Sequence, residues 1–158
     1  MTDLLASIEG SALAVWTRES PSIWAYSTIL TLHTFGLAIV AGAHAVIDCR
    51  LLGVAPRIPV GALPPLFPIM WWAFALNLVT GILLFMADAT AKAGQLVFYV
   101  KLAVIALALL VTIAIAKSLR RATVAFDARA PLRLRMLAVL SLVLWIAAIV
   151  AGRLLAYQ

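Results

Sequence analysis

The chain has 158 residues, of which 66% are hydrophobic and only 11% are charged, and its mean hydropathy is +1.14. Soluble domains carry about 25% charged residues, so this composition excludes the soluble classes of enzyme and binding domain. Lys and Arg outnumber Asp and Glu by 12 to 6, which gives a net charge of +6. The sequence therefore predicts an all-α integral membrane protein.

Residues 1–20 form a separate N-terminal segment. Asp3 and Glu9 interrupt its apolar residues and it lacks a basic start, so we do not expect a cleavable signal peptide. A mostly apolar stripe at helical spacing predicts a short amphipathic helix at the membrane surface. The stripe consists of Leu4, Ile8, Ser11, Ala12, Val15 and Trp16. Ser20 and Pro21 then predict an N-cap and a first helical position, where the first span would begin.

The rest of the chain, residues 21–158, contains four apolar runs. Each is long enough to cross a bilayer, which takes about 20 residues. Little sequence is left for another domain, so we predict a single bundle of four transmembrane helices. The predicted spans are 23–47, 64–87, 96–116 and 136–155.

The loops predict the orientation in the membrane. Most basic residues lie between spans one and two or between spans three and four, and the positive-inside rule makes both loops cytoplasmic. They are Arg50, Arg57, Lys117, Arg120, Arg121, Arg129, Arg133 and Arg135. Both termini would then be periplasmic, in a bacterial inner membrane. These cations predict contact with lipid headgroups rather than with nucleic acid.

Both histidines of the chain, His33 and His44, lie in the first span. Their spacing of 11 residues is close to three helical turns, so we expect both rings on one face, about 16 Å apart along the axis. Polar side chains inside membrane spans are costly and mark candidate functional sites. Two imidazoles on one face predict a site for haem or a metal ion.

Counting residues from the ends of the spans gives the expected neighbours of each histidine. We expect Asn77, Thr80 and Trp145 at the depth of His33. For His44, nearer the cytoplasmic end, the count gives Met70, Trp71 and Trp72.

Cations and small residues suggest further contacts with a cofactor. Lys101 and Arg153 lie near the periplasmic ends of their spans, where they would pair with carboxylates of a cofactor or extend to the interface. Gly36 and its small neighbours would admit a flat macrocycle or let two helices pack closely.

The ligand count leaves three modes of haem or metal binding open. The two histidines share one helix, so they cannot both bind one iron within a single chain. A methionine, Met70 or Met86, could be the second axial ligand, or two copies of the chain could pair equivalent histidines. A five-coordinate haem or a copper ion would use one histidine. Cys49 is the only cysteine, which excludes CxxCH-attached haem and iron–sulfur clusters.

Four segments carry a resemblance to a known family. They read LHTFGLAIVAGAHAVIDCRLLG, WWAFALNLVTGILLFMADA, FYVKLAVIAL and AGRLLAY. Together they resemble the four-span bacterial membrane proteins of the DUF6644-like group, and more distantly the CopD-type and cytochrome b561-like four-helix proteins. Members of the group often have another histidine late in the third span, where this chain reads IAIAKSLRR. The family-like positions are His33, the region from Asp48 through Arg50 to Gly53, Gly81, Lys101 and Arg153.

Three functions remain as hypotheses. The first is an electron-transfer subunit that binds haem b through His33, with a second haem at His44, and passes electrons between a periplasmic partner and quinone. The second is a non-redox assembly or anchoring subunit with structural histidines. The third is copper handling. In each case we expect a homo-oligomer or a subunit of a larger membrane complex.

Overall fold

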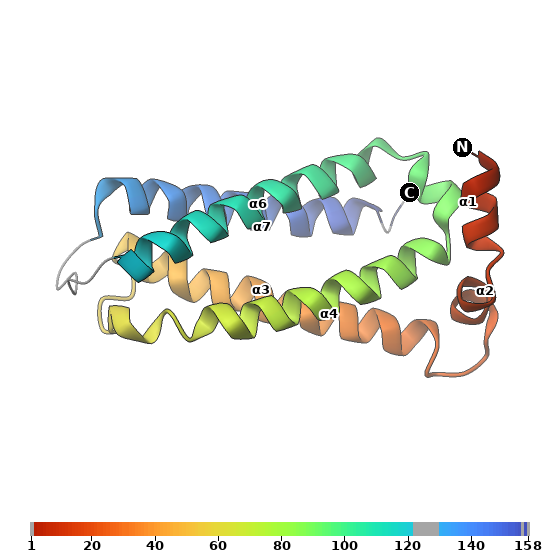
Figure 1. The fold of residues 1–158 in the computed structure, drawn as a ribbon, viewed down its shortest axis with the longest axis horizontal. Coiled ribbons are helices and arrows are strands. Elements are labelled where there is room, and N and C mark those ends of the chain that lie inside the picture. Colours follow the sequence, from red (N-terminus) through yellow and green to blue (C-terminus); the bar gives the residue numbers. More distant parts are fainter. Residues whose placement is uncertain (1, 122–129, 156, 158) are drawn as a thin grey trace.

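The computed structural model describes residues 2–121, 130–155 and 157. Within them the chain forms helices and turns, and four long helices lie side by side (Figure 1). These are α3 (Tyr26–Leu52), α4 (Leu66–Met86), α6 (Leu96–Arg121) and α7 (Leu132–Leu155). The shorter helices are α1 (Thr2–Glu9), α2 (Ala12–Glu19), the 3-10 turn η1 (Val60–Ala62) and α5 (Ala89–Ala93).

The four long helices are long and apolar enough to cross a membrane, which confirms a helical, multi-pass membrane protein. Their outer surface is also apolar. Trp72 is 79% exposed, and Phe35 and Leu110 are each more than 60% exposed. A continuous apolar exterior of this kind is unfavourable in water and favourable in lipid.

The core forms where α3 packs against α4 and α7, and where α6 packs against α7. Gly36 brings α3 and α4 together, because a Cβ atom at this position would lie only 3.0 Å from the backbone oxygen of Ala73. A small residue at a helix contact allows this kind of close approach in membrane bundles. The sequence allowed two roles for Gly36, room for a flat macrocycle or close packing of two helices. Its contact with α4 is of the second kind.

The ends of three spans differ from those that the sequence predicts, and one of them is α6, which continues five residues past the predicted end at residue 116 to Arg121. Helix α3 begins at Tyr26, not at Ser20, and Ser20 instead ends α2 as its C-cap. At its other end α3 continues past residue 47 to Leu52, because Gly53 adopts a φ of 84° and terminates the helix there. Helix α7 begins at Leu132, four residues before the predicted start, so its first turn also contains Arg133 and Arg135.

The N-terminal segment forms two short helices rather than one. Ser11 separates them and caps α2, since its side chain accepts a hydrogen bond from the amide of Ala14 at 3.4 Å. Ala14 and Thr17 face inward and are almost fully buried, while Leu4 and Trp16 are exposed. The exposed pair belongs to the apolar stripe, so contact of this face with the membrane surface stays a prediction.

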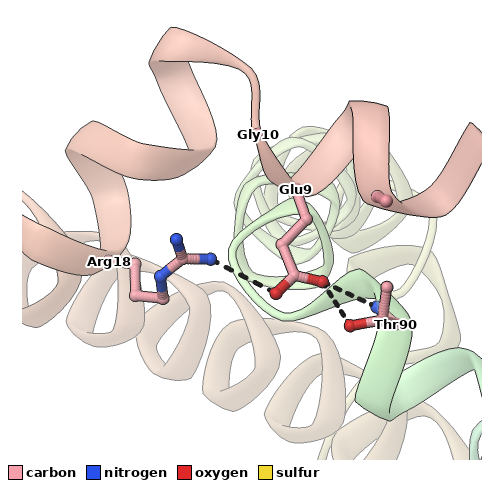
Figure 2. A pocket seen from close by; sticks show the side chains of 5 residues that line it. Glu9, Gly10, Arg18 and Thr90 are labelled. Atoms are coloured by element: carbon pink, nitrogen blue, oxygen red, sulfur yellow. Dashed lines mark hydrogen bonds and ion pairs between the residues drawn. The ribbon is translucent and has the colours of Figure 1, made fainter. Parts of the chain in front are cut away.

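The two helices close one end of the bundle, the end where both termini lie (Figure 1). Figure 2 shows Glu9 between Arg18 of α2 and Thr90 of α5. The Glu9 carboxylate accepts hydrogen bonds from the Thr90 hydroxyl and from its amide at 3.0 Å. Arg18 donates to the carbonyl of Ala87 at 3.1 Å, and its other contacts are with Glu9 and Glu19. We name this assembly of α1 and α2 the N-terminal cap.

The Glu9 contact predicts a pH dependence of the N-terminal cap. Hydrogen bonds from Thr90, helped by the charge of Arg18, lower the pKa of Glu9 below its ordinary value of 4.5. The contact of the N-terminal cap with α5 is therefore stabilised above pH 4.5, and this stabilisation is lost as the pH falls through the lowered pKa of Glu9. In amide correlation spectra in micelles, we expect the Thr90 signal to titrate with a midpoint below 4.5 and to stop titrating in Glu9→Gln. A midpoint at or above 4.5 would contradict this.

The end of α3 and the start of α7 lie at the opposite end of the bundle (Figure 1). Arg50 of α3 is buried there, and its guanidinium donates to the backbone oxygen of Ile58. Of the basic loop residues, Arg129 lies outside the described residues.

Candidate functional site

His33 occupies a partly buried position in α3, facing α4. Its Nδ1 atom lies 3.0 Å from the hydroxyl oxygen of Thr80. One turn earlier on α4, the amide of Asn77 donates to the backbone carbonyl of His33 at 2.6 Å. Asn77 and Thr80 therefore lie at the depth of His33, as counting along the spans predicts.

The hydrogen bonds of Thr80 determine which ring nitrogen of His33 carries the proton. A threonine hydroxyl has one hydrogen, and that of Thr80 is donated to the carbonyl of Leu76 at 2.7 Å. The oxygen then accepts the Nδ1 hydrogen of His33. This assigns the tautomer in which Nε2 is unprotonated and has a lone pair to offer. Among the described residues, Nε2 has no hydrogen-bond partner and is not enclosed.

Gly81 makes room for the His33 ring. A Cβ atom at Gly81 would lie 3.1 Å from Cε1 of the imidazole, closer than side chains normally approach. The ring is thus positioned from two sides, by the hydroxyl of Thr80 and by the bare backbone of Gly81. A second residue that fixes the tautomer and the orientation of the ring is typical of histidines that bind a metal.

The two predicted cations lie at the same end of the bundle as His33. The side chain of Lys101 on α6 reaches α7, since a Cβ atom added at Gly152 would lie 3.6 Å from its Nζ. The charge of Lys101 also interacts with the His33 ring. Within the part of the chain that the structure describes, Lys101 has no hydrogen bond or ion pair. Arg153 is exposed, with its guanidinium 5.3 Å from the centre of the Tyr157 ring. Lys101 is therefore the better placed of the two to meet an anionic group near His33.

His44 lies in a different environment and is only 2% exposed. Its Nε2 is 3.1 Å from the hydroxyl of Thr112 on α6, and its Nδ1 is 3.3 Å from the hydroxyl of Ser141 on α7. The ring also lies against Trp145, with 4.8 Å between ring centres. We call this group, together with Asp48, the His44 cluster.

Both nitrogens of His44 are used within the chain. Thr112 donates its hydrogen to the carbonyl of Ala108 at 2.8 Å, so it accepts from Nε2, and Ser141 is left to donate to Nδ1. No lone pair remains for iron. The geometry of His44 is that of a structural histidine that ties three helices together.

One depth assignment from the sequence needs correction. Trp145 was expected beside His33 and instead contacts His44. The hydrogen-bond and ring partners of His44 come from α6 and α7, and the expected depth of Met70 stays a prediction. Met70 is 1% exposed and belongs to the apolar core between the helices.

The described residues contain no group of three or more His, Cys, Asp and Glu side chains that could hold a metal ion. Two cavities are described elsewhere in the molecule. One, of about 240 Å³, lies under the N-terminal cap and is lined by Glu9, Arg18 and Thr90 among others (Figure 2). The other, of about 330 Å³, lies between α6 and α7 and is lined by Leu110, Lys117 and Arg133 among others. Neither includes His33.

Three polar residues of the His44 cluster were not among the predicted site residues: Thr112, Ser141 and Asp48. Each is 0% exposed. Thr112 and Ser141 are weak signals in a sequence, since hydroxyl side chains in apolar helices commonly bond to their own backbone. Asp48 lies just outside the predicted first span, 23–47, but it is a buried residue of α3. No family model, curated protein or solved structure matches the chain.

Proposed function

We propose that the protein is a membrane electron-transfer subunit that binds haem b through Nε2 of His33. The observation that carries this proposal is the hydrogen bond from His33 to Thr80, which leaves Nε2 as an oriented, accessible lone pair. The resemblance of the sequence to DUF6644-like and cytochrome b561-like membrane proteins points in the same direction.

The donor set favours haem over a bare metal ion. A copper or zinc ion needs several protein ligands, and the described residues provide no cluster of three. A haem brings four nitrogen donors of its own and needs only one or two axial ligands from protein. One free imidazole is enough for it. Copper handling is therefore the weaker hypothesis.

The position of His33 suggests that two copies of the chain share the haem. Nε2 is accessible, and neither described cavity lies beside it. If His33 lies near the axis of a two-fold symmetric dimer, the two copies together would offer two imidazoles to one haem. His44 is not proposed as a second haem ligand because both its nitrogens are hydrogen-bonded.

The residues around His33 would tune such a group. Bound haem would supply one-electron redox chemistry. Thr80 holds the proton on Nδ1, which keeps Nε2 free, and Gly81 keeps the ring in place. The ammonium of Lys101 would attract a propionate and oppose the extra positive charge of the oxidised state.

Absorption spectra of the detergent-purified protein test the proposal. Protein from haem-replete cells should show sharp α and Soret bands after dithionite reduction, and His33→Ala should lose them. Thr34→Ala is the matched control, because Thr34 is an exposed neighbour on α3 that bonds only to Leu30. Mass measurement should give two chains per haem. A colourless wild type, or unchanged bands in His33→Ala, would exclude His33 as the ligand.

The orientation and partners form part of the same proposal. The basic loops favour a bacterial inner membrane with cytoplasmic loops and periplasmic termini. His33 would then lie on the periplasmic side of His44, suited to receive electrons from a periplasmic partner and pass them to quinone.

A non-redox assembly or anchoring subunit is the second candidate. The observation that favours it is that both ring nitrogens of His44 are hydrogen-bonded within the chain, as expected for a histidine with a structural role. This candidate predicts a colourless protein and near-normal stability of His33→Gln.

A further inference from the structure

Asp48 is an acidic side chain buried inside the bundle. It is 0% exposed, and neither of its carboxylate oxygens has a hydrogen-bond partner among the described residues. It lies one turn after His44 on α3, so it belongs to the inner surface where α3 meets α7. A buried carboxylate without a donor or counter-ion is strongly unfavourable when it is ionised.

No described cation compensates this charge. Arg50, two residues further along α3, points its guanidinium at the Ile58 carbonyl. Arg133 and Arg135 are the basic residues of α7 at this end, and α6 contributes the uncharged Thr112 beside His44, with Lys117 and Arg120 nearer its end. Neither carboxylate oxygen of Asp48 is hydrogen-bonded to any of these residues.

Ser141 connects Asp48 to His44. Its hydroxyl oxygen lies 3.3 Å from Nδ1 of His44, and Ser141 is also near enough to interact with Asp48, although it makes no hydrogen bond to the carboxylate in this structure. From His44 the hydrogen bonds continue through Nε2 to Thr112 and the backbone of α6. The hydrogen bonds of His44 thus span three helices inside an apolar bundle, and Asp48 lies one turn away on α3.

We propose that Asp48, Ser141 and His44 form an internal proton-binding site, in which Asp48 holds the proton as a neutral carboxylic acid and Ser141 links it to His44. The acid gives Asp48 a hydrogen to donate to the Ser141 oxygen, while the Ser141 hydrogen points to Nδ1 of His44. The site does not depend on whether His33 binds haem.

The arrangement also defines one proton-transfer step. The Ser141 hydroxyl gives its hydrogen to Nδ1 of His44 as it takes the hydrogen of the Asp48 acid. One O–H bond breaks on Asp48 and one N–H bond forms on His44. The products are a carboxylate on Asp48 and an imidazolium on His44. The net charge of the cluster does not change, because the proton stays within it. Internal carboxylic acids and histidines linked in this way are the groups that move protons in membrane proteins.

Infrared spectroscopy of the wild-type protein in lipid tests the site. A protonated carboxylic acid has a carbonyl band above the amide bands, and we expect this band at neutral pH, shifted by uniform ¹³C-aspartate labelling. Asp48→Asn should remove it, whereas the matched control Asp88→Asn, at an exposed position before α5, should keep it. Ser141→Ala should move the band to higher frequency because the acid loses its hydrogen-bond acceptor.

A second variant keeps the test independent of the folding of Asp48→Asn. Replacing Asp3, Asp88 and Asp127 together by Asn leaves Asp48 as the only aspartate, and the labelled band should persist in this protein. Absence of the band from the wild type, or its persistence in Asp48→Asn, would overturn the proposal. An ionised Asp48 with thermal stability that rises on addition of Na⁺ would identify a metal-cation site instead and would equally overturn it.

Discussion

Replacing Gly36 by leucine is expected to push α3 away from α4 and to destabilise the bundle by about 3 kcal/mol, the upper part of the range for overpacked cores. The physical reason is the position of the obstruction. A Cβ atom at Gly36 would lie 3.0 Å from the backbone oxygen of Ala73 and 3.3 Å from the side chain of Asn77. Backbone cannot rotate away as a flexible side chain can, so the whole helix must shift.

Gly42 provides the matched control for this substitution. It lies on the same helix, is exposed, and has nothing within 4 Å of an added Cβ. Leucine improves helix propensity by the same amount at both positions, so the difference between the two variants isolates the clash. Unfolding in mixed micelles with increasing dodecyl sulfate should separate them clearly. Equal stability of Gly36→Leu and Gly42→Leu would show that α3 and α4 are not in close contact.

His44→Ala is expected to destabilise the protein by about 3 kcal/mol, as for the truncation of a large core side chain. The change removes a ring that is 2% exposed and packs against Trp145, and it deprives the hydroxyls of Thr112 and Ser141 of their partner. Glutamine at this position keeps a donor and an acceptor, so His44→Gln should lose less. The same unfolding experiment measures all three proteins.

Substitutions of the two histidines should therefore have different effects on stability and on the haem bands. His33 is only partly buried and makes one side-chain hydrogen bond, so His33→Ala should lose about 1 kcal/mol of stability together with the haem bands. His44→Ala should lose stability and keep the bands. A His44→Ala protein as stable as the wild type, or one without pigment, would contradict the structural role of this residue.

The number of spans could be predicted from sequence, but their ends could not. Apolar runs of sufficient length identify α3, α4, α6 and α7, because lipid requires a minimum helix length. Charged residues do not end a helix, however. Helix α3 continues through Asp48 and Arg50, which are both buried in the protein interior, and it ends only where Gly53 allows a positive φ.

The same limit explains which neighbours of the histidines were predictable. Asn77 and Thr80 were assigned correctly to His33. Trp145 was assigned to the wrong histidine, because counting residues from the predicted ends of the spans does not determine how far the helices are shifted along one another. Thr112 gave no signal, because its contact with His44 depends on how α6 rotates about its own axis. Only tertiary packing sets that rotation.

The N-terminal cap has a consequence for the biogenesis of the protein. Glu9 and Thr90 are 81 positions apart. The cap therefore leaves the ribosome long before α5, which can join it only after the translocon has released both α3 and α4 and their hairpin has inserted. Until then Glu9 lacks the hydrogen bonds from Thr90, and the junction between α1 and α2 at Ser11 stays open to proteases. Closure of the cap thus reports that the first hairpin has been correctly inserted.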